Sequence, residues 1–250
     1  MKIEEDKEII CGINIVEAVL NSRPKSAKVL FILDSKSNSR VKNISSKAQS
    51  CGVESTLKTK DFFSTYCKDQ NHQGLALLCD KRLEENESLL DKLLNKESLL
   101  LLILDHMTDP QNVGACLRSA AAANVDAVIV PKNRACHLTP TVRKVSSGGS
   151  ELVPFVVVTN LVRTIKKMKL SDVNIVGAEK NGETNYKELV LEKKNALIIG
   201  SEDKGLKKLT AENCDTLIRV DLPGGVESLN ASVACGILLF EFVSKSENFI

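Results

Sequence analysis

Three segments in the second half of the chain carry the polar residues that could do chemistry. The first is residues 105–123, DHMTDPQNVGACLRSAAAA. Asp109 suits a helix N-cap and Pro110 the first helical position, so a helix is predicted to start there. Asn112 then lies in its first turn, at the strand ends where open α/β sheets bind ligands. Arg118 follows Gly114 by one turn, so a small residue leaves space beside its guanidinium.

The second segment is Gly200-Ser-Glu-Asp-Lys-Gly205, directly after an apolar run. Glycines allow a backbone to approach a ligand closely, and Glu202 adds a carboxylate at the edge of such a turn. We predict that Glu202 either pairs with Arg118 or accepts hydrogen bonds from a hydroxyl or amine of a ligand.

The third segment, residues 220–233, reads VDLPGGVESLNASV. A strand, a Pro-Gly-Gly turn and a helix beginning near Ser228 are predicted, so Ser228, Asn230 and the free helix N–H groups converge on one point. The helix stays apolar through Val243 and must be buried on more than one side. Either a partner subunit covers its second side, or the helix is buried within a monomer.

A parallel sheet covered by helices is predicted to position these segments, because its strands are apolar on both faces. Six such runs occur, at residues 99–105, 127–131, 154–158, 173–178, 196–200 and 216–220. They predict a six-stranded, mostly parallel α/β sheet in residues 98–250.

The first 80 residues are predicted to form a separate small α/β unit. Helices are expected at 13–21 and about 40–51 and a strand at 29–33, and short apolar stretches recur near 53–57 and 75–79. Residues 81–97 are dense in charge and are interpreted as a linker with a short surface helix. The predicted domains are therefore 1–80 and 98–250, joined by the linker 81–97.

Composition limits the possible functions. The formal net charge is +2, so any nucleic-acid surface must be local, and an aromatic content of 4% without Trp disfavours a base-stacking platform. No apolar run is long enough to span a membrane. The eight cysteines include no CxxC pair, which argues against a metal site or a disulfide framework and favours reduced thiols in a cytoplasmic protein. Cys116 and Cys235 are interpreted as packing residues.

A local basic patch does exist. Residues 25–47 carry six basic side chains against one acid. RNA backbone contact is the functional interpretation and a solvated face the alternative. His72 is interpreted as an RNA contact or as a hydrogen-bonded turn residue. The residues predicted to bind RNA are Lys25, Lys28, Arg40, Lys42 and His72.

The order of the three segments resembles the SpoU/TrmH branch of the SPOUT RNA methyltransferases, over about residues 99–243. Residues 10–17 (ICGINIVE) and 71–75 (NHQGL) resemble the substrate-binding extension of the bacterial rRNA guanosine 2'-O-methyltransferases in that branch. A dinucleotide-binding fold would instead have its glycine-rich turn after the first strand. The glycine turns here follow the last two strands.

The resemblance implies a ribosomal-protein-like RNA-binding domain, a knotted SPOUT domain with a deep trefoil, a homodimer through that domain, and S-adenosyl-L-methionine as cofactor. It implies methyl transfer to a ribose 2'-hydroxyl of rRNA, with guanosine in the large subunit as the leading substrate. The implied cofactor-binding residues are Gly200, Val220, Leu222 and Leu229. The implied catalytic residues are Asn112, Arg118, Glu202, Ser228 and Asn230.

Some alternatives stay open. Arg118 is either a true base or a phosphate contact, because a guanidinium pKa above about 12 makes deprotonation costly. A tRNA 2'-O-methyltransferase is the rival enzyme, and the N-terminal extension disfavours it. A non-catalytic rRNA assembly factor is the rival of another class, and the intact polar set disfavours it.

Overall fold

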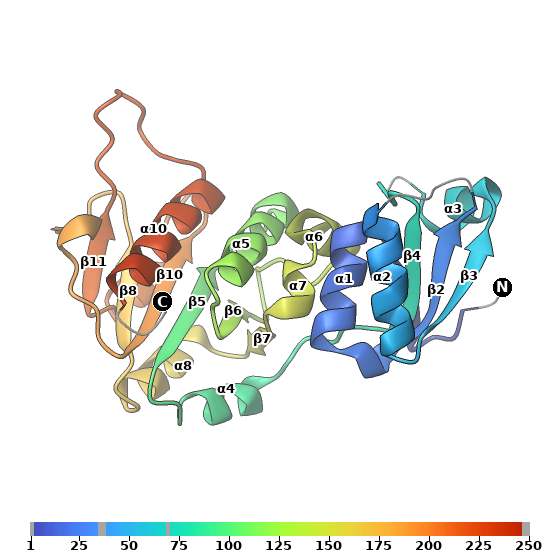
Figure 1. The fold of residues 1–250 in the computed structure, drawn as a ribbon. Coiled ribbons are helices and arrows are strands. Elements are labelled where there is room, and N and C mark those ends of the chain that lie inside the picture. The colour runs from blue at the N-terminus through green and yellow to red at the C-terminus, as the bar shows by residue number, and fades with distance from the viewer. Residues whose placement is uncertain (1–2, 35–38, 69–70, 247–250) are drawn as a thin grey trace. The chain divides into compact units, whose positions relative to one another are not determined.

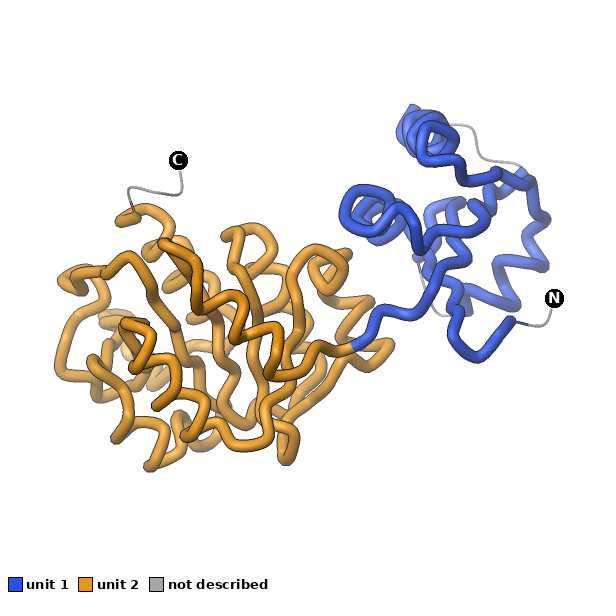
Figure 2. Tube along the Cα trace, turned by 90° about the horizontal axis from the view of Figure 1, so that it is seen from below, with its two compact units in different colours: residues 1–83 blue, residues 84–250 orange. Residues whose placement is uncertain are grey.

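The computed structural model describes residues 3–34, 39–68 and 71–246, and the chain divides into two compact units, residues 1–83 and 84–250 (Figures 1 and 2). The elements of unit 1 are β1 (Lys7–Cys11), α1 (Ile13–Ser22), η1 (Pro24–Ser26), β2 (Ala27–Leu33), α2 (Ser39–Ser50), β3 (Glu54–Lys58), α3 (Lys60–Tyr66) and β4 (Leu75–Asp80).

Unit 1 is a four-stranded mixed sheet in the order β1-β4-β2-β3, in which β4 is antiparallel to both neighbours and β2 is parallel to β3. Successive strand residues point to opposite faces. Leu30 and Leu77 pack in the cluster that includes α1 and α2, while Phe31 and Ala76 pack with Phe63 of α3. The two helices and the strand expected in this region form close to their predicted positions, and the two apolar stretches correspond to β3 and β4. Strand β1 and helix α3 were not expected.

One pair of cysteines departs from the expected reduced state. Cys11 and Cys67 form a disulfide, with 5.9 Å between their Cα atoms. They are 56 residues apart in sequence, so no short spacing signals the pair. The fold brings the end of β1 beside the end of α3, within bonding range. The expectation of reduced thiols is therefore wrong for this pair.

Unit 2 is a seven-stranded sheet in the order β7-β6-β5-β10-β8-β11-β9, and all its neighbouring strands are parallel. The strands are β5 (Leu99–Asp105), β6 (Ala127–Pro131), β7 (Phe155–Val158), β8 (Asn174–Ala178), β9 (Thr184–Asn185), β10 (Lys194–Gly200) and β11 (Thr216–Arg219). All six predicted strands are confirmed. The seventh, β9, is two residues long and has no apolar pattern to reveal it.

Helices cover both faces of this sheet and enclose two core clusters (Figure 1). One face carries α5 (Pro110–Ala122) and α10 (Ala231–Lys245), with α6 (Pro140–Ser146) and α7 (Gly149–Leu152) against α5. The other carries α4 (Glu87–Leu93), α8 (Leu161–Lys169) and α9 (Lys208–Ala211), and the 3-10 turn η2 (Tyr186–Glu188) follows β9.

The boundary between the units differs from the predicted linker at 81–97. Leu90, Leu93 and Leu94 are buried in the core of unit 2, so α4 is part of that unit and not a surface helix. Glu85 also pairs with β7. The charged side chains of this segment lie on its exposed face and conceal the apolar stripe.

Strand order determines where the three polar segments meet. β5 and β10 are neighbours in parallel register, with Asp105 opposite Gly200, so the first and second segments begin side by side. β8 lies between β10 and β11. The third segment leaves β11 and returns to this region through α10, which packs on α5 and β10.

Candidate functional site

Asn112, Glu202 and Asn230 meet in one hydrogen-bonded group, here called the amide–carboxylate cluster. Glu202 Oε1 accepts hydrogen bonds from the side-chain amides of Asn112 and Asn230, the latter at 3.0 Å. The Asn230 amide also donates to Asn112 Oδ1 at 2.9 Å. Each residue comes from a different one of the three segments. The cluster therefore holds the ends of β5, β10 and α10 together.

Helix caps fix two members of this cluster. The Asp109 carboxylate accepts from the backbone N–H groups of Gln111 and Asn112, as predicted for the start of α5. Asn230 Oδ1 accepts from the N–H groups of Ser232 and Val233, so α10 begins at Ala231. The prediction that this helix begins near Ser228 is wrong, because Asn230 provides the cap and Ser228 precedes it in the loop.

A tight turn presents Glu202. Ser201 and Gly205 exchange two backbone hydrogen bonds of 3.1 and 2.8 Å. Gly205 has a φ of +61°, and a Cβ on Gly200 would lie 2.1 Å from the Gly205 carbonyl carbon. Both positions therefore require glycine, the first for its conformation and the second for the close approach.

A cavity of about 390 Å³ opens beside this turn. That volume suits a small-molecule ligand, for which pockets of about 300–1,000 Å³ are usual. Its walls combine apolar side chains from the sheet and α10 with polar groups from three loops. All four predicted cofactor-binding residues line it: Gly200, Val220, Leu222 and Leu229. Two of the predicted catalytic residues, Glu202 and Ser228, line it as well.

Arg118 stands apart from the cluster. It is exposed and has no hydrogen bond or ion pair within the described parts of the chain. Its predicted pairing with Glu202 is not formed. Arg118 follows Asn112 by six residues, which at about 100° per residue puts it about 120° around the helix. Glu202 instead accepts from the two asparagines, and Ser228 makes no hydrogen bond in the same described region.

Small residues let other elements approach α5. A Cβ on Gly114 would lie 2.6 Å from Val145 Cβ and 2.9 Å from the Val142 carbonyl oxygen. A Cβ on Gly149 would lie 3.1 Å from Arg118 Cα. The predicted thin face of this helix is thus in contact with α6 and α7, which holds the helix backbone in place at Arg118.

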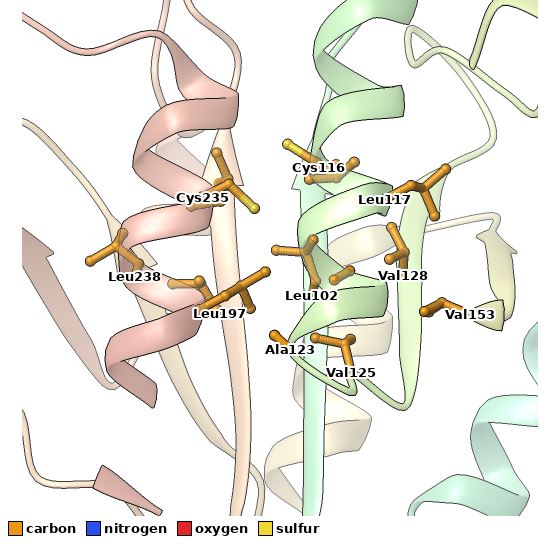
Figure 3. Packing of buried hydrophobic residues seen from close by; sticks show 14 of the residues in the cluster. Leu102, Cys116, Leu117, Ala123, Val125, Val128, Val153, Leu197, Cys235 and Leu238 are labelled. Carbon is orange, nitrogen blue, oxygen red and sulfur yellow. The ribbon is translucent and has the colours of Figure 1, made fainter. Parts of the chain in front are cut away.

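Cys116 and Cys235 face each other between α5 and α10, both fully buried (Figure 3). The hydrogen bond with Cys116, together with burial, raises the pKa of the Cys235 thiol well above its usual value. A protonated thiol is a weak nucleophile. The two residues pack these helices together, in agreement with their interpretation from sequence.

In unit 1 four of the five predicted RNA-binding residues are exposed, and two of those four already have a partner. Lys25 and Lys42 have exposed side chains, whereas Arg40 donates to Asn14 and Lys28 pairs with Asp80 at 2.9 Å. His72 is different: it is part-buried, and its ring lies 4.6 Å from that of Phe63 in α3. Its Nδ1 accepts from the Gly74 N–H, as the turn interpretation expects. Lys36 of the basic patch lies outside the described residues.

The loop after β8 also lines the cavity, although no motif in the sequence singles it out. Ala178, Glu179 and Lys180 line the cavity beside the Gly200–Gly205 turn. β8 is next to β10 in the sheet although 15 residues lie between the two strands along the chain, and strand order alone reveals that they are neighbours.

Two kinds of feature, membrane-spanning helices and metal-binding clusters, are not found in the described part of the chain. Among the described residues no helix is long and apolar enough to span a membrane. The same residues contain no group of three His, Cys, Asp or Glu side chains arranged to hold a metal ion.

Two family models match the chain. The model of the SpoU rRNA Methylase family matches residues 99–240. The model described as RNA 2'-O ribose methyltransferase substrate binding matches residues 9–84. The first contains the cluster and the cavity, and the second nearly coincides with unit 1.

Curated relatives match over almost the whole chain. A 23S rRNA (guanosine-2'-O-)-methyltransferase RlmB from Coxiella burnetii is 43% identical over 240 residues, 95% of this chain and 96% of the relative. The protein of the same name from Escherichia coli K12 is 39% identical over 239 residues, 95% and 98% of the two chains.

Solved structures share the fold at lower identity. A structure titled RNA 2'-O ribose methyltransferase has a TM-score of 0.77 at 21% identity and covers 96% of this chain and 89% of its own. AviRb from Streptomyces viridochromogenes, a SpoU methyltransferase in complex with AdoMet, has a TM-score of 0.74 at 18% identity, covering 94% and 89%.

Proposed function

The chain belongs to the SpoU rRNA methylase family, and we propose that it transfers a methyl group from S-adenosylmethionine to a ribose 2'-hydroxyl, that of a guanosine in 23S rRNA. The observation that carries this proposal is the cluster of Asn112, Glu202 and Asn230 at the edge of a cavity suited to a nucleoside-sized ligand.

The cavity fits the cofactor that the family uses. Its apolar wall from Val220, Leu222 and Leu229 would hold an adenine ring, and the close approach of Gly200 to Gly205 keeps the neighbouring turn compact. When bound, the cofactor supplies the methyl group on its sulfonium. The fixed turn and helix caps give the reaction a rigid site, because in-line displacement depends strongly on positioning.

The polar residues take different roles. The cluster holds the ends of its three segments in place and offers polar atoms to the target nucleotide. Arg118, exposed and unpaired in the described chain, is free to contact RNA. It either binds a neighbouring phosphate or takes the proton of the 2'-hydroxyl. The phosphate role agrees better with an arginine pKa above about 12. Ser228, in the cavity wall, lies where it could hydrogen-bond either ligand.

A homodimer through unit 2 completes this proposal. Val233, Ile237 and Phe240 are 50, 37 and 50% exposed. Their spacing of four and three residues puts them on one stripe of α10. An exposed apolar stripe of this kind is typical of an interface. The helix carrying it packs directly on α5, which carries Arg118.

RNA capture is assigned to unit 1. Lys25 and Lys42 present free positive charge to solvent, and the model for the substrate-binding extension matches this unit. Phosphate contacts of this kind position an RNA without reading its sequence. Ribosomal RNA as substrate implies action in the cytoplasm. A trefoil knot around the cofactor loops remains a prediction from the family.

The experiment that tests the function is a map of ribose methylation. We expect one 2'-O-methylated guanosine of 23S rRNA to be lost in a deletion strain and restored by the wild-type gene. Loss of a tRNA position instead would favour the tRNA enzyme. No loss at any position, together with no binding of S-adenosylmethionine in a titration, would favour the assembly factor.

A further inference from the structure

Glu179 lines the cavity and has no role in the cluster. It follows β8, is half-buried, and lies beside the Gly200–Gly205 turn. Its side chain accepts one long hydrogen bond, 3.4 Å from the Leu206 N–H, and makes no ion pair within the described chain. A carboxylate offers about four acceptor positions. Most of them are therefore open to a ligand in the cavity.

The other acidic residues of the cavity are less suited to this role. Glu202 already accepts from Asn112 and Asn230. The Glu227 side chain is 93% exposed and pairs with Lys180 at 3.7 Å. Asp203 is exposed. Glu179 is thus the acidic residue of the cavity that is part-buried and has most of its hydrogen-bond acceptor positions unused.

We propose that the Glu179 carboxylate binds the cofactor by accepting hydrogen bonds from its donor groups. This inference rests on the proposed function. S-adenosylmethionine carries two kinds of strong donor, the ribose hydroxyls and the amino-acid ammonium. An acid at the end of a strand next to a glycine turn is a known arrangement for binding ribose hydroxyls in α/β proteins.

The carboxylate also braces the turn. A Cβ on Gly205 would lie 3.2 Å from both carboxylate oxygens, and the Leu206 N–H points to the same group. A test must therefore separate bracing from binding. Glu179→Gln keeps an oxygen that can accept from Leu206 but removes the charge, and Glu179→Asp keeps the charge on a shorter side chain.

The test is calorimetric titration of the full-length chain with S-adenosylhomocysteine. We expect Glu179→Gln to raise its dissociation constant about tenfold or more, because hydrogen bonds to charged groups are the stronger ones. Glu179→Asp should bind more tightly than Glu179→Gln. The control Glu183→Gln removes the same charge from an exposed residue outside the cavity and should leave affinity unchanged.

A second ligand identifies the donor. 5'-Methylthioadenosine keeps the ribose hydroxyls but lacks the ammonium. Equal weakening for both ligands assigns the contact to the nucleoside part, and weakening for S-adenosylhomocysteine alone assigns it to the ammonium. Both results support the proposal. Unchanged affinity in Glu179→Gln, or equal losses in the Gln and Asp variants, would overturn it. A wild-type chain that binds neither ligand contradicts the proposed function itself.

Discussion

Arg118 is a charged residue of the candidate site that has no partner among the described residues, although α6 and α7 fix the helix that carries it. Such an arrangement suits a side chain whose partner is the RNA substrate. Arginine and lysine differ here, since a guanidinium binds phosphate in a two-pronged geometry and an ammonium acts as a point charge.

The first prediction concerns this side chain. Arg118→Ala should lower kcat about 10²–10⁴-fold if the residue takes the proton. It should mainly raise KM for RNA if the residue binds phosphate. Arg118→Lys separates these roles: strong activity across pH would contradict a special guanidine role. Calorimetric binding of S-adenosylhomocysteine should stay unchanged in both variants, because Arg118 does not line the cavity.

The second prediction concerns Asn230, which caps α10 and donates to Glu202. Asn230→Ala should lower the free energy of unfolding by about 1 kcal/mol through loss of the cap. Asn230→Asp keeps a capping oxygen but sets two carboxylates side by side, so methylation should fall while the cap survives. Urea denaturation and a methylation assay give the two readouts. Full activity of Asn230→Asp would refute a role for the cluster.

Sequence predicted the members of this site better than their contacts. Asn112, Glu202 and Asn230 each follow the end of a strand, and strand ends in a parallel sheet meet at one edge. The partner of Glu202 depends on the rotation of α5 about its axis and on where α10 begins. A shift of the helix start from Ser228 to Ala231 turns Asn230 into the cap.

At the level of elements, the close packing of α5 against α6 requires a glycine at position 114, where any side chain would collide with α6. The third prediction is that Gly114→Ala lowers the free energy of unfolding by about 1–3 kcal/mol, because its Cβ would overlap Val145 and the backbone at Val142. Gly224→Ala is the matched control, since nothing lies within 4 Å of a Cβ there. Equal stability of the two variants in urea denaturation would show that α6 can move away without cost.

The fourth prediction concerns the disulfide that joins β1 to the end of α3. Cys67→Ser should destabilise unit 1 by about 2–4 kcal/mol, because the bond closes a long loop between residues with a sequence separation of 56. Hydrogen exchange should show faster opening of β1 and α3 in the full-length chain. Cys51→Ser, at an exposed free cysteine, should leave the exchange unchanged. A reducing agent should speed the exchange of β1 and α3 in the wild type as much as Cys67→Ser does. It should not change the exchange of the Cys67→Ser variant.

Elements with a continuous apolar pattern were predictable, and the others were not. The six apolar strands of unit 2 stand out in sequence, and all of them except the part-buried β11 are largely buried on both faces. β9 has two residues, and β1 begins with charged and part-buried positions. The prediction of a surface helix is wrong for α4, because its charges are on one face and its buried leucines on the other.

For the whole molecule, the two units serve one reaction only if RNA reaches both. Free positive charge is at Lys25 and Lys42 in unit 1, and the cavity is within unit 2. The near-neutral total charge conceals this local positive charge. The total charge therefore gives no sign of an RNA-binding surface, whereas the local distribution predicts one in unit 1.

The last prediction concerns a second copy of the chain. The stripe of Val233, Ile237 and Phe240 leaves apolar surface in water on a helix whose opposite side is in the core. If two copies pair through it, Phe240→Asp should convert the chain to a monomer, because a charge buried in an apolar interface is strongly unfavourable. Analytical ultracentrifugation should then show half the wild-type mass.

Activity connects this surface to the site. α10 carries the stripe on one side, and its cap Asn230 belongs to the cluster. A monomeric Phe240→Asp variant should therefore lose methylation while keeping a folded unit 2 by hydrogen exchange. Leu170→Asp, at an apolar residue that is 89% exposed after α8, should remain dimeric and active. A monomeric wild type, or a fully active monomeric variant, would show that one copy contains the complete site.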